Sequence, residues 1–223
     1  YKNVAVAEKA RYDRKLEGCG LMKRCVIIGG ADIHNYDRVR SYLRPEDFCI
    51  YCDSGLYHQE RLCAHPDLIV GDFDSHPRPE STAETIVLPT VKDDTDPVFA
   101  VQEAPRRGVS GGRMDHTLVN IYLLVMLQNA GKSAVLVDDF SEMRMVGAEP
   151  MEISDSFPYY SLMNITGTAR GVTETGCKYP LRDAEITSEY QYGTSNEVLP
   201  GQTAAVSVKE GSLLLIKVFP KDA

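Results

Sequence analysis

The first half of the chain repeats one pattern that strongly limits its fold. Short, continuous apolar runs end in Gly or Asp, and amphipathic stretches follow them. Apolar runs without alternation are typical of strands buried on both faces of a parallel sheet. We expect strands at 25–30, 48–53, 68–72, 85–89 and 134–138, and helices at 34–43, 55–63, 96–104 and 117–129. This alternation predicts a Rossmann-like α/β unit with a parallel sheet.

From about residue 141 the pattern changes, because helical spacing disappears and glycine-containing turns separate short strand-like runs. The candidate strands are 142–146, 159–165, 169–174, 203–209 and 212–218. Regularly spaced short strands indicate an antiparallel sandwich or barrel. We therefore divide the chain into an N-terminal extension (1–21), an α/β catalytic domain (22–140) and an all-β domain (141–223).

Composition and charge exclude several classes of protein. Hydrophobic residues make up 43% and charged residues 25%, as in globular chains. The net charge of −8 argues against nucleic acid or an anionic membrane as partner. The most apolar stretch, 121–127, is too short to span a bilayer, and residues 1–21 mix charges throughout, unlike a secretory signal peptide. We expect a cytoplasmic protein.

Six cysteines are too few for a disulfide framework in a chain of 223 residues. Cys49 and Cys52 have the spacing of a metal-binding pair, but no second pair follows. They also lie in an apolar, strand-like run. We interpret them as buried structural cysteines.

Carboxylates follow the predicted strands of the first half. Asp53 ends one strand, and Asp72 and Asp74 come directly after another. In an open parallel sheet, ligands bind beyond the carboxyl ends of the strands. Several carboxylates gathered there would repel one another unless a cation lies between them, and oxygen ligands suit Mg²⁺. The alternative is a solvated turn, in which Asp is also common.

A second acidic cluster, the sequence KDDTD at 92–96, precedes Pro97. It is typical of a helix N-terminus, where carboxylates and Thr cap the helix. Lys92 and Asp96 would also lie at the carboxyl edge of the sheet, beside Asp72 and Asp74. A metal with a neighbouring lysine is an arrangement that binds phosphate.

The segment GGRMDH at 111–116 leads into a predicted helix that contains Asn120. Gly112 and its neighbour expose backbone N–H groups to a phosphate, and Arg113 offers a bidentate guanidinium. His116 and Asn120 share a helical face because they are four residues apart. On its own, His116 is better interpreted as a packed or capping histidine than as a catalytic base. The chain has neither a Walker A loop nor a Gly-x-Ser-x-Gly motif, which excludes the usual P-loop kinases and serine hydrolases.

The second half contains one polar cluster, YGTSNE at 192–197. Gly, Ser and Asn are common turn residues, so a hairpin turn explains this cluster without any function.

The order of these motifs resembles thiamine pyrophosphokinase (thiamine diphosphokinase) of the bacterial type. The resemblance covers residues 25–218 and rests on DSG at 53–55, HPDLIVGDFDS at 65–75, KDDTD at 92–96, GGRMDH at 111–116 with Asn120, KYPL at 178–181 and GTSNE at 193–197. No single motif is specific, but six motifs in this order are unlikely to arise by accident.

The resemblance implies an α/β catalytic domain, a thiamine-binding β-sandwich domain and a homodimer with active sites between subunits. It implies transfer of the pyrophosphoryl group of ATP to the hydroxyl of thiamine, which gives thiamine diphosphate and AMP. The resemblance also implies a role for each matching residue. Asp72, Asp74 and Asp96 would hold Mg²⁺, with Asp53 nearby, while Lys92 and Arg113 would neutralise phosphate charge and Gly112, His116 and Asn120 would also contact ATP. The thiamine site would be lined by Asp115 and, from the partner subunit, by Thr194, Ser195 and Asn196.

The chain departs from this family in two places. The family has a hydrophobic strand before the GGR loop, but residues 105–110 are too short and polar to form one. Either the strand is lost, which would damage the sheet, or residues are missing there; we favour the second. Residues 1–21 have no counterpart in the family.

Two other functions fit the residues without the resemblance. One is a nucleotide hydrolase or nucleotide-sugar transferase that holds Mg²⁺ or Mn²⁺ with Asp-x-Asp. The other is a non-catalytic thiamine- or nucleotide-binding protein. The intact set Asp72, Asp74 and Asp96 argues against the second.

Overall fold

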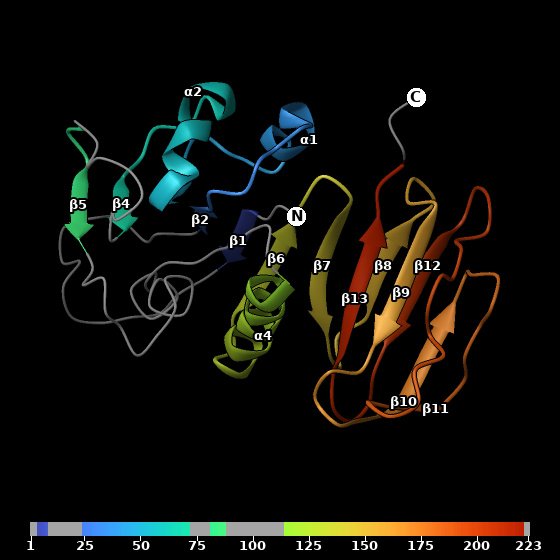
Figure 1. Cartoon of the computed structure of the whole chain (residues 1–223). Helices are drawn as coiled ribbons and strands as arrows, with labels where there is room; N and C mark the ends of the chain where they lie inside the picture. Colours follow the sequence, from blue (N-terminus) through green and yellow to red (C-terminus); the bar gives the residue numbers. More distant parts are fainter. Residues whose placement is uncertain (1–3, 9–23, 72–80, 88–113, 221–223) are drawn as a thin grey trace. The chain divides into compact units, whose positions relative to one another are not determined.

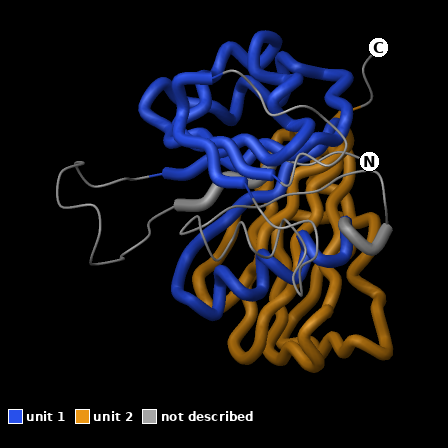
Figure 2. Tube along the Cα trace, turned by 60° about the vertical axis from the view of Figure 1, so that its left-hand side comes forward, with its two compact units in different colours: residues 1–139 blue, residues 140–223 orange. Residues whose placement is uncertain are grey.

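The computed structural model describes residues 4–8, 24–71, 81–87 and 114–220; of residues 4–8 and 114–116 it describes the backbone. The chain divides into two compact units, residues 1–139 and 140–223 (Figure 2). In the described part of the chain, no helix is both long and apolar enough to span a bilayer.

The sheet of unit 1 has the strand order β5-β4-β3-β2-β1-β6 (Figure 1). Its strands are β1 Val4–Glu8, β2 Arg24–Ile28, β3 Phe48–Cys52, β4 Leu68–Gly71, β5 Glu84–Val87 and β6 Ser133–Val137. β2 pairs with β3, β3 with β4 and β4 with β5, in each case in parallel. The parallel sheet predicted from the continuous apolar runs is therefore confirmed, and β2, β3 and β4 are almost completely buried.

The central strand β1 comes from the N-terminal extension. Residues 1–21 were expected to have no counterpart in the family, and no strand was predicted there; five of them, Val4–Glu8, form a strand between β2 and β6. β1 is antiparallel to both neighbours, and Val6 pairs with Val26 on one side and Val135 on the other. The segment 105–110, from which the family would supply a strand, lies outside the described residues.

The described helices of unit 1 differ in length from the predicted ones. They are α1 Tyr36–Arg40, the 3₁₀ helix η1 Asp53–His58, α2 Gln59–Leu62 and α4 Met114–Asn129. α1 is shorter than 34–43, whereas α4 begins three residues before 117. Asn35 caps α1, because its side chain accepts a hydrogen bond from the N–H of Arg38. α2 stops at Cys63, which has the left-handed φ of 53°. The helix expected at 96–104 lies outside the described residues.

Cys49 and Cys52 lie in the core of unit 1, as expected for structural cysteines. Both thiols are free and buried, and burial raises the pKa of Cys49 to about 12. Because the two residues are three apart on a strand, their side chains lie on opposite faces of the sheet. The pair therefore has no geometry for a shared metal.

Unit 2 consists of two antiparallel sheets (Figure 1). Within this unit, one sheet has the strand order β7-β13-β9 and the other has the order β11-β10-β12-β8. The strands are β7 Ser141–Val146, β8 Met151–Ser154, β9 Tyr159–Met163, β10 Thr168–Thr175, β11 Ala184–Thr187, β12 Thr203–Ser207 and β13 Leu213–Val218. The five predicted strands are confirmed; β8 and β11, only four residues each, were not predicted. Both sheets contribute side chains to one hydrophobic cluster.

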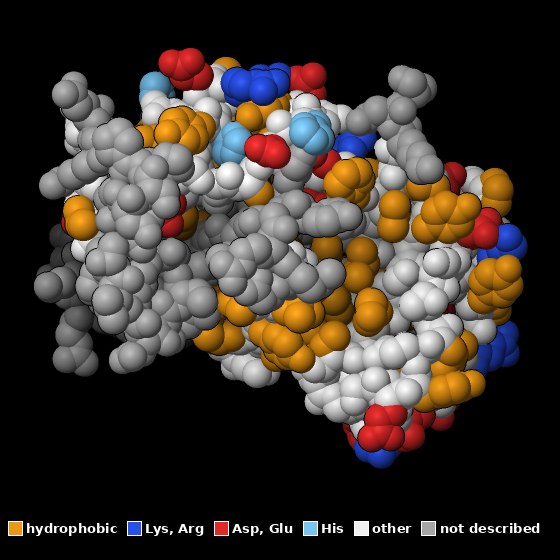
Figure 3. Space-filling view, in the orientation of Figure 1, with side chains coloured by type: hydrophobic (Ala, Val, Ile, Leu, Met, Phe, Trp, Pro, Cys, Tyr) orange, Lys and Arg blue, Asp and Glu red, His pale blue; other side chains and the backbone are white. Residues whose placement is uncertain are grey.

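Helix α4 is apolar on more than one face. Leu123 and Leu127 form a cluster with Ala134 of β6. Leu118, Tyr122 and Met126 are instead exposed, at 49%, 55% and 39%. Their spacing of four residues places them in one stripe along the helix. Hydrophobic side chains are visible over α4 in the space-filling view (Figure 3).

Candidate functional site

The carboxyl ends of β3 and β4 lie side by side in unit 1. Cys52 pairs with Val70 in the parallel register, so the next residues along the two strands, Asp53 and Gly71, are also neighbours. A methyl group placed on Gly71 would lie 1.9 Å from Asp53 Oδ1. The Asp53 carboxylate therefore lies directly against the backbone of the residue that precedes Asp72.

Glycines allow the same edge to pack closely at its other strand ends. A Cβ on Gly30 would lie 1.8 Å from Ser54 Oγ, and one on Gly55 would lie 2.3 Å from the carbonyl oxygen of Ile28. Asp53 itself has a φ of 46°, a conformation that Asp tolerates better than most residues. The turn after β3 is thus held tightly against the end of β2.

Several residues predicted for this edge lie outside the described residues, namely Asp72, Asp74, Lys92, Asp96, Gly112 and Arg113. Asp115 and His116 belong to the first turn of α4, and Asn120 lies one turn further on and is 1% exposed. Of the predicted phosphate-side residues, the described side chains are therefore Asp53 and Asn120. Within the described ranges, no group of three or more His, Cys, Asp or Glu could hold a metal ion.

Sequence reasoning missed Asp139, which follows β6. Its carboxylate accepts hydrogen bonds from the backbone N–H groups of His34, at 3.1 Å, and Asn35, also at 3.1 Å. Arg38 donates to its carbonyl oxygen at 2.5 Å. Asp139 thereby fixes the segment between β2 and α1. The sequence pattern that singled out Asp53, a carboxylate after a predicted strand, could also have identified Asp139.

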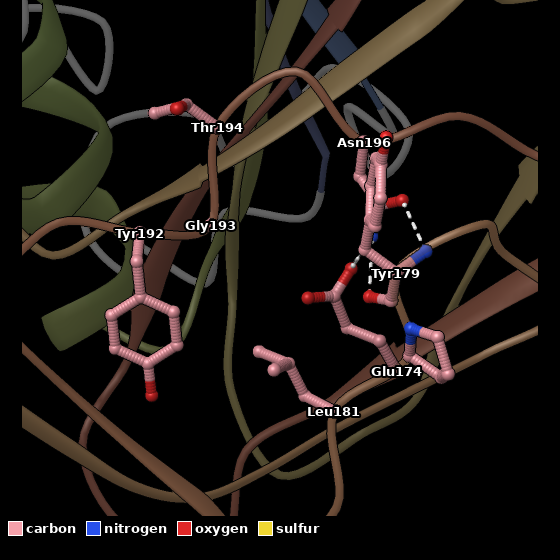
Figure 4. A pocket seen from close by; sticks show the side chains of 8 residues that line it. Glu174, Tyr179, Leu181, Tyr192, Gly193, Thr194 and Asn196 are labelled. Carbon is pink, nitrogen blue, oxygen red and sulfur yellow. Dashed lines mark hydrogen bonds between the residues drawn. The ribbon is translucent and has the colours of Figure 1, made fainter.

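Unit 2 contains a pocket of about 270 Å³ (Figure 4). Its lining residues come from the end of β10 and the two loops that contain KYPL and GTSNE: Glu174, Tyr179, Pro180, Leu181, Tyr192, Gly193, Thr194 and Asn196. Two segments that the sequence singled out separately therefore meet at one cavity. Tyr179 and Tyr192 are 59% and 39% exposed, so both keep ring surface open to a ligand.

A buried carboxylate lies in this pocket. Glu174 is 1% exposed, and its Oε2 accepts hydrogen bonds from the hydroxyl of Tyr160 at 2.6 Å and from Nδ2 of Asn196 at 3.0 Å. Burial raises the pKa of Glu174, although both hydrogen bonds act in the opposite direction. Burial also raises the pKa of Tyr160, so this hydroxyl stays protonated and donates.

The three residues of unit 2 that were predicted to line a thiamine pocket have different positions. Thr194 and Asn196 line the cavity, whereas Ser195 does not; it is exposed, has a φ of 57° and donates its N–H to Ser161 Oγ at 3.0 Å. Asn196 Nδ2 also donates to Tyr179 O, and its Oδ1 accepts from the N–H of Tyr179 and of Glu197. Its side chain therefore holds the two loops together.

These features define a class of protein with a parallel-sheet unit, a carboxylate at its strand ends, and an antiparallel β unit with a pocket. Two family models match the chain in this order. The thiamin pyrophosphokinase catalytic domain matches residues 39–136, and the thiamin pyrophosphokinase vitamin B1 binding domain matches residues 150–213. The chain belongs to the thiamine pyrophosphokinase family and is an enzyme of this type.

Relatives support this membership over nearly the whole chain. The thiamine pyrophosphokinase of Bacillus subtilis (strain 168) is 30% identical over 212 residues, which is 88% of this chain and 99% of the relative. A crystal structure of thiamine pyrophosphokinase from Bacillus subtilis matches with a TM-score of 0.75 at 24% identity and covers 87% of this chain and 98% of its own. That from Geobacillus thermodenitrificans matches with a TM-score of 0.71 at 26% identity and covers 88% and 97%.

Proposed function

We propose that the chain transfers the pyrophosphoryl group of ATP to the primary hydroxyl of thiamine. The observation that carries the proposal is the match of a catalytic and a vitamin B1 binding domain, in that order, to units 1 and 2. The thiamine oxygen forms a bond to the β-phosphorus, the bond between that phosphorus and the oxygen of the α-phosphate breaks, and AMP leaves. The hydroxyl proton passes to a base, for which a carboxylate is suited.

Unit 1 is proposed to bind ATP at the carboxyl edge of its sheet. Lys92 and Arg113 neutralise negative charge on the transferred phosphates, the main requirement of such a transfer. Gly112, His116 and Asn120 contribute to the same site, and Asp115 faces thiamine. The support is the order of the motifs and the position of Asp53 beside Gly71.

The oxygen atoms at this edge of the sheet are of the kind that bind a divalent cation. Asp53 presents a carboxylate against Gly71, and Asp72 follows Gly71 in the chain, so oxygen ligands are concentrated here. We propose that Asp72, Asp74 and Asp96, with Asp53 nearby, hold Mg²⁺. When bound, Mg²⁺ would neutralise phosphate charge and orient the triphosphate.

Unit 2, which we infer to be a β-sandwich, is proposed to bind thiamine in the pocket between the KYPL and GTSNE loops. Tyr179, Leu181 and Tyr192 offer apolar and aromatic surface to the rings of thiamine. Thr194 lines the pocket and Asn196 fixes its walls, while Ser195 lies on the adjacent turn.

We further propose a homodimer in which the active site combines the α/β unit of one subunit with the β unit of the other, in the cytoplasm. The exposed stripe of Leu118, Tyr122 and Met126 on α4 supports association, because such a stripe gains by being covered. Sedimentation velocity tests this: a dimer is expected, and a monomer at micromolar concentration would contradict it.

Product analysis tests the proposed reaction. Protein, ATP and Mg²⁺ are incubated with and without thiamine, and nucleotides and thiamine phosphates are quantified. AMP and thiamine diphosphate are expected in equal amounts, and only when thiamine is present. ADP with thiamine monophosphate would mean γ-phosphoryl transfer. Nucleotide breakdown without thiamine would mean a hydrolase, and no turnover would mean a binding protein.

A further inference from the structure

The Glu174 carboxylate has one oxygen that the protein uses and one that it does not. Oε2 receives the two hydrogen bonds from Tyr160 and Asn196, whereas no described residue donates a hydrogen bond to Oε1. Figure 4 shows the second oxygen turned away from Asn196, toward the part of the pocket bounded by Tyr192 and Leu181. This second oxygen is therefore the part of the carboxylate that a ligand in the pocket can contact.

The described residues supply no cation to this carboxylate. None of the described residues that line the pocket is a Lys or Arg. The neighbouring Lys178 is engaged elsewhere, since its Nζ lies 2.6 Å from Glu197 Oε1 and 5.5 Å from the centre of the Tyr179 ring. The pocket thus combines a negative oxygen with exposed tyrosine rings. Aromatic faces and a carboxylate together favour an organic cation over a neutral ligand.

We propose that Glu174 is a specificity-determining residue of the unit 2 pocket, where its Oε1 favours a positively charged ligand over a neutral ligand of the same shape. This inference rests on the proposed function, because the thiazolium ring of thiamine carries a permanent positive charge. Tyr160 and Asn196 both donate to Oε2, so their hydrogen bonds leave Oε1 available to a ligand. Asn196 also ties this carboxylate to the loop that contains Tyr179.

A fluorescent reporter allows binding to this pocket to be measured directly. The chain contains no tryptophan, so a Tyr179→Trp variant has a single indole at the pocket. Tyr179 is mostly exposed, and its backbone N–H and carbonyl group make the hydrogen bonds to Asn196, so the substitution keeps an aromatic ring and these contacts. Titrations with thiamine and with its neutral thiophene isostere give two dissociation constants, whose ratio measures selectivity for the cation.

The test compares this ratio in three proteins that all contain Tyr179→Trp. The reporter alone is expected to prefer thiamine by about tenfold or more, as for a close charge pair. Glu174→Gln keeps an acceptor for Tyr160 and Asn196 but removes the charge, and the ratio should fall to about one. Tyr160→Phe removes a hydrogen bond and leaves the charge, so the ratio should stay within about threefold of the reporter's. Thermal unfolding of each variant shows that it is folded.

Each other outcome has a definite meaning. An unchanged ratio of dissociation constants in Glu174→Gln overturns the proposal. A fall of this ratio in Tyr160→Phe as large as that in Glu174→Gln also overturns it, because it would indicate a structural role. Fluorescence that does not respond to thiamine, in a protein that still makes thiamine diphosphate, overturns the role of this pocket while the proposed reaction stands. A cation preference that depends on Glu174, in a protein that makes no thiamine diphosphate, supports the selectivity and contradicts the proposed reaction.

Discussion

At the scale of single residues, burial decides the behaviour of His58. The residue is 7% exposed, and its Nδ1 is hydrogen-bonded to the hydroxyl of Tyr36 at 2.7 Å. Burial lowers the pKa of His58 below its ordinary value of 6.5. The unfolded chain therefore binds a proton at His58 more readily than the folded chain does. The contribution of neutral, buried His58 to the free energy of unfolding is present above about pH 6.5 and is lost as the pH falls toward the pKa of the folded state.

We therefore expect His58→Gln to reduce the acid sensitivity of folding, because Gln retains an acceptor for Tyr36 but does not titrate. The measurement is the free energy of unfolding by urea between pH 7.5 and pH 5.5. His65→Gln, at an exposed histidine, is the matched control and should follow the unchanged protein. Parallel pH profiles for the unchanged protein and His58→Gln would refute the assignment.

The strand-end carboxylates make a second prediction at this scale. Asp72→Asn and Asp74→Asn should each lower turnover by about a hundredfold or more while leaving the fold intact, because each removes a charge proposed to hold Mg²⁺. Asp37→Asn, at a side chain of α1 that is 90% exposed, is the control. Near-normal turnover of either variant at saturating Mg²⁺ would overturn the metal assignment.

Sequence reasoning predicted the position of Asp53 at the edge of the sheet but did not single out Glu174. Asp53 was predictable because a carboxylate after a buried apolar run lies at the edge where ligands bind. Glu174 was not, because its neighbours in the chain form an ordinary alternating strand and its partners Tyr160 and Asn196 are 14 and 22 residues away. Only the fold brings these three side chains together, and it also gives Asn196 its internal hydrogen bonds.

At the scale of elements, the pattern of apolar residues and the burial of each strand explain which parts of the fold were predictable. β2, β3 and β4 are buried and continuously apolar, so their sequence indicates both strand and parallel sheet. β8 and β11 contain four residues each and give too little pattern for prediction. β1 was missed because charged residues follow it closely in the sequence, while its pairing partners β2 and β6 lie far along the chain.

The position of β1 between two strands predicts the effect of breaking it. Val6→Pro should destabilise unit 1 by about 3 kcal/mol, because proline lacks an N–H and is poorly tolerated within a central strand. Val6→Thr keeps a β-branched side chain and serves as the control. Urea unfolding of both variants measures the difference. Equal stability of Val6→Pro and Val6→Thr would show that this strand does not contribute to the folded sheet.

At the scale of the whole molecule, each unit has one recognisable family domain. Residues 39–136 match the catalytic domain and residues 150–213 match the vitamin B1 binding domain, and the chain spans 99% of its Bacillus subtilis relative. The net charge of −8 agrees with small-molecule substrates and a cation at the acidic edge more than with a polyanionic partner. The central claim is therefore that a pyrophosphoryl group passes intact from ATP to thiamine.

The most direct test follows the β-phosphorus of ATP. Two reactions with thiamine are run in parallel, one with ATP labelled at the β-phosphorus and one with ATP labelled at the γ-phosphorus. For pyrophosphoryl transfer, we expect both labels to enter the thiamine product in equal amounts and the released AMP to carry neither. A thiamine product that contains the γ-label alone, with the β-label retained in ADP, would contradict pyrophosphoryl transfer.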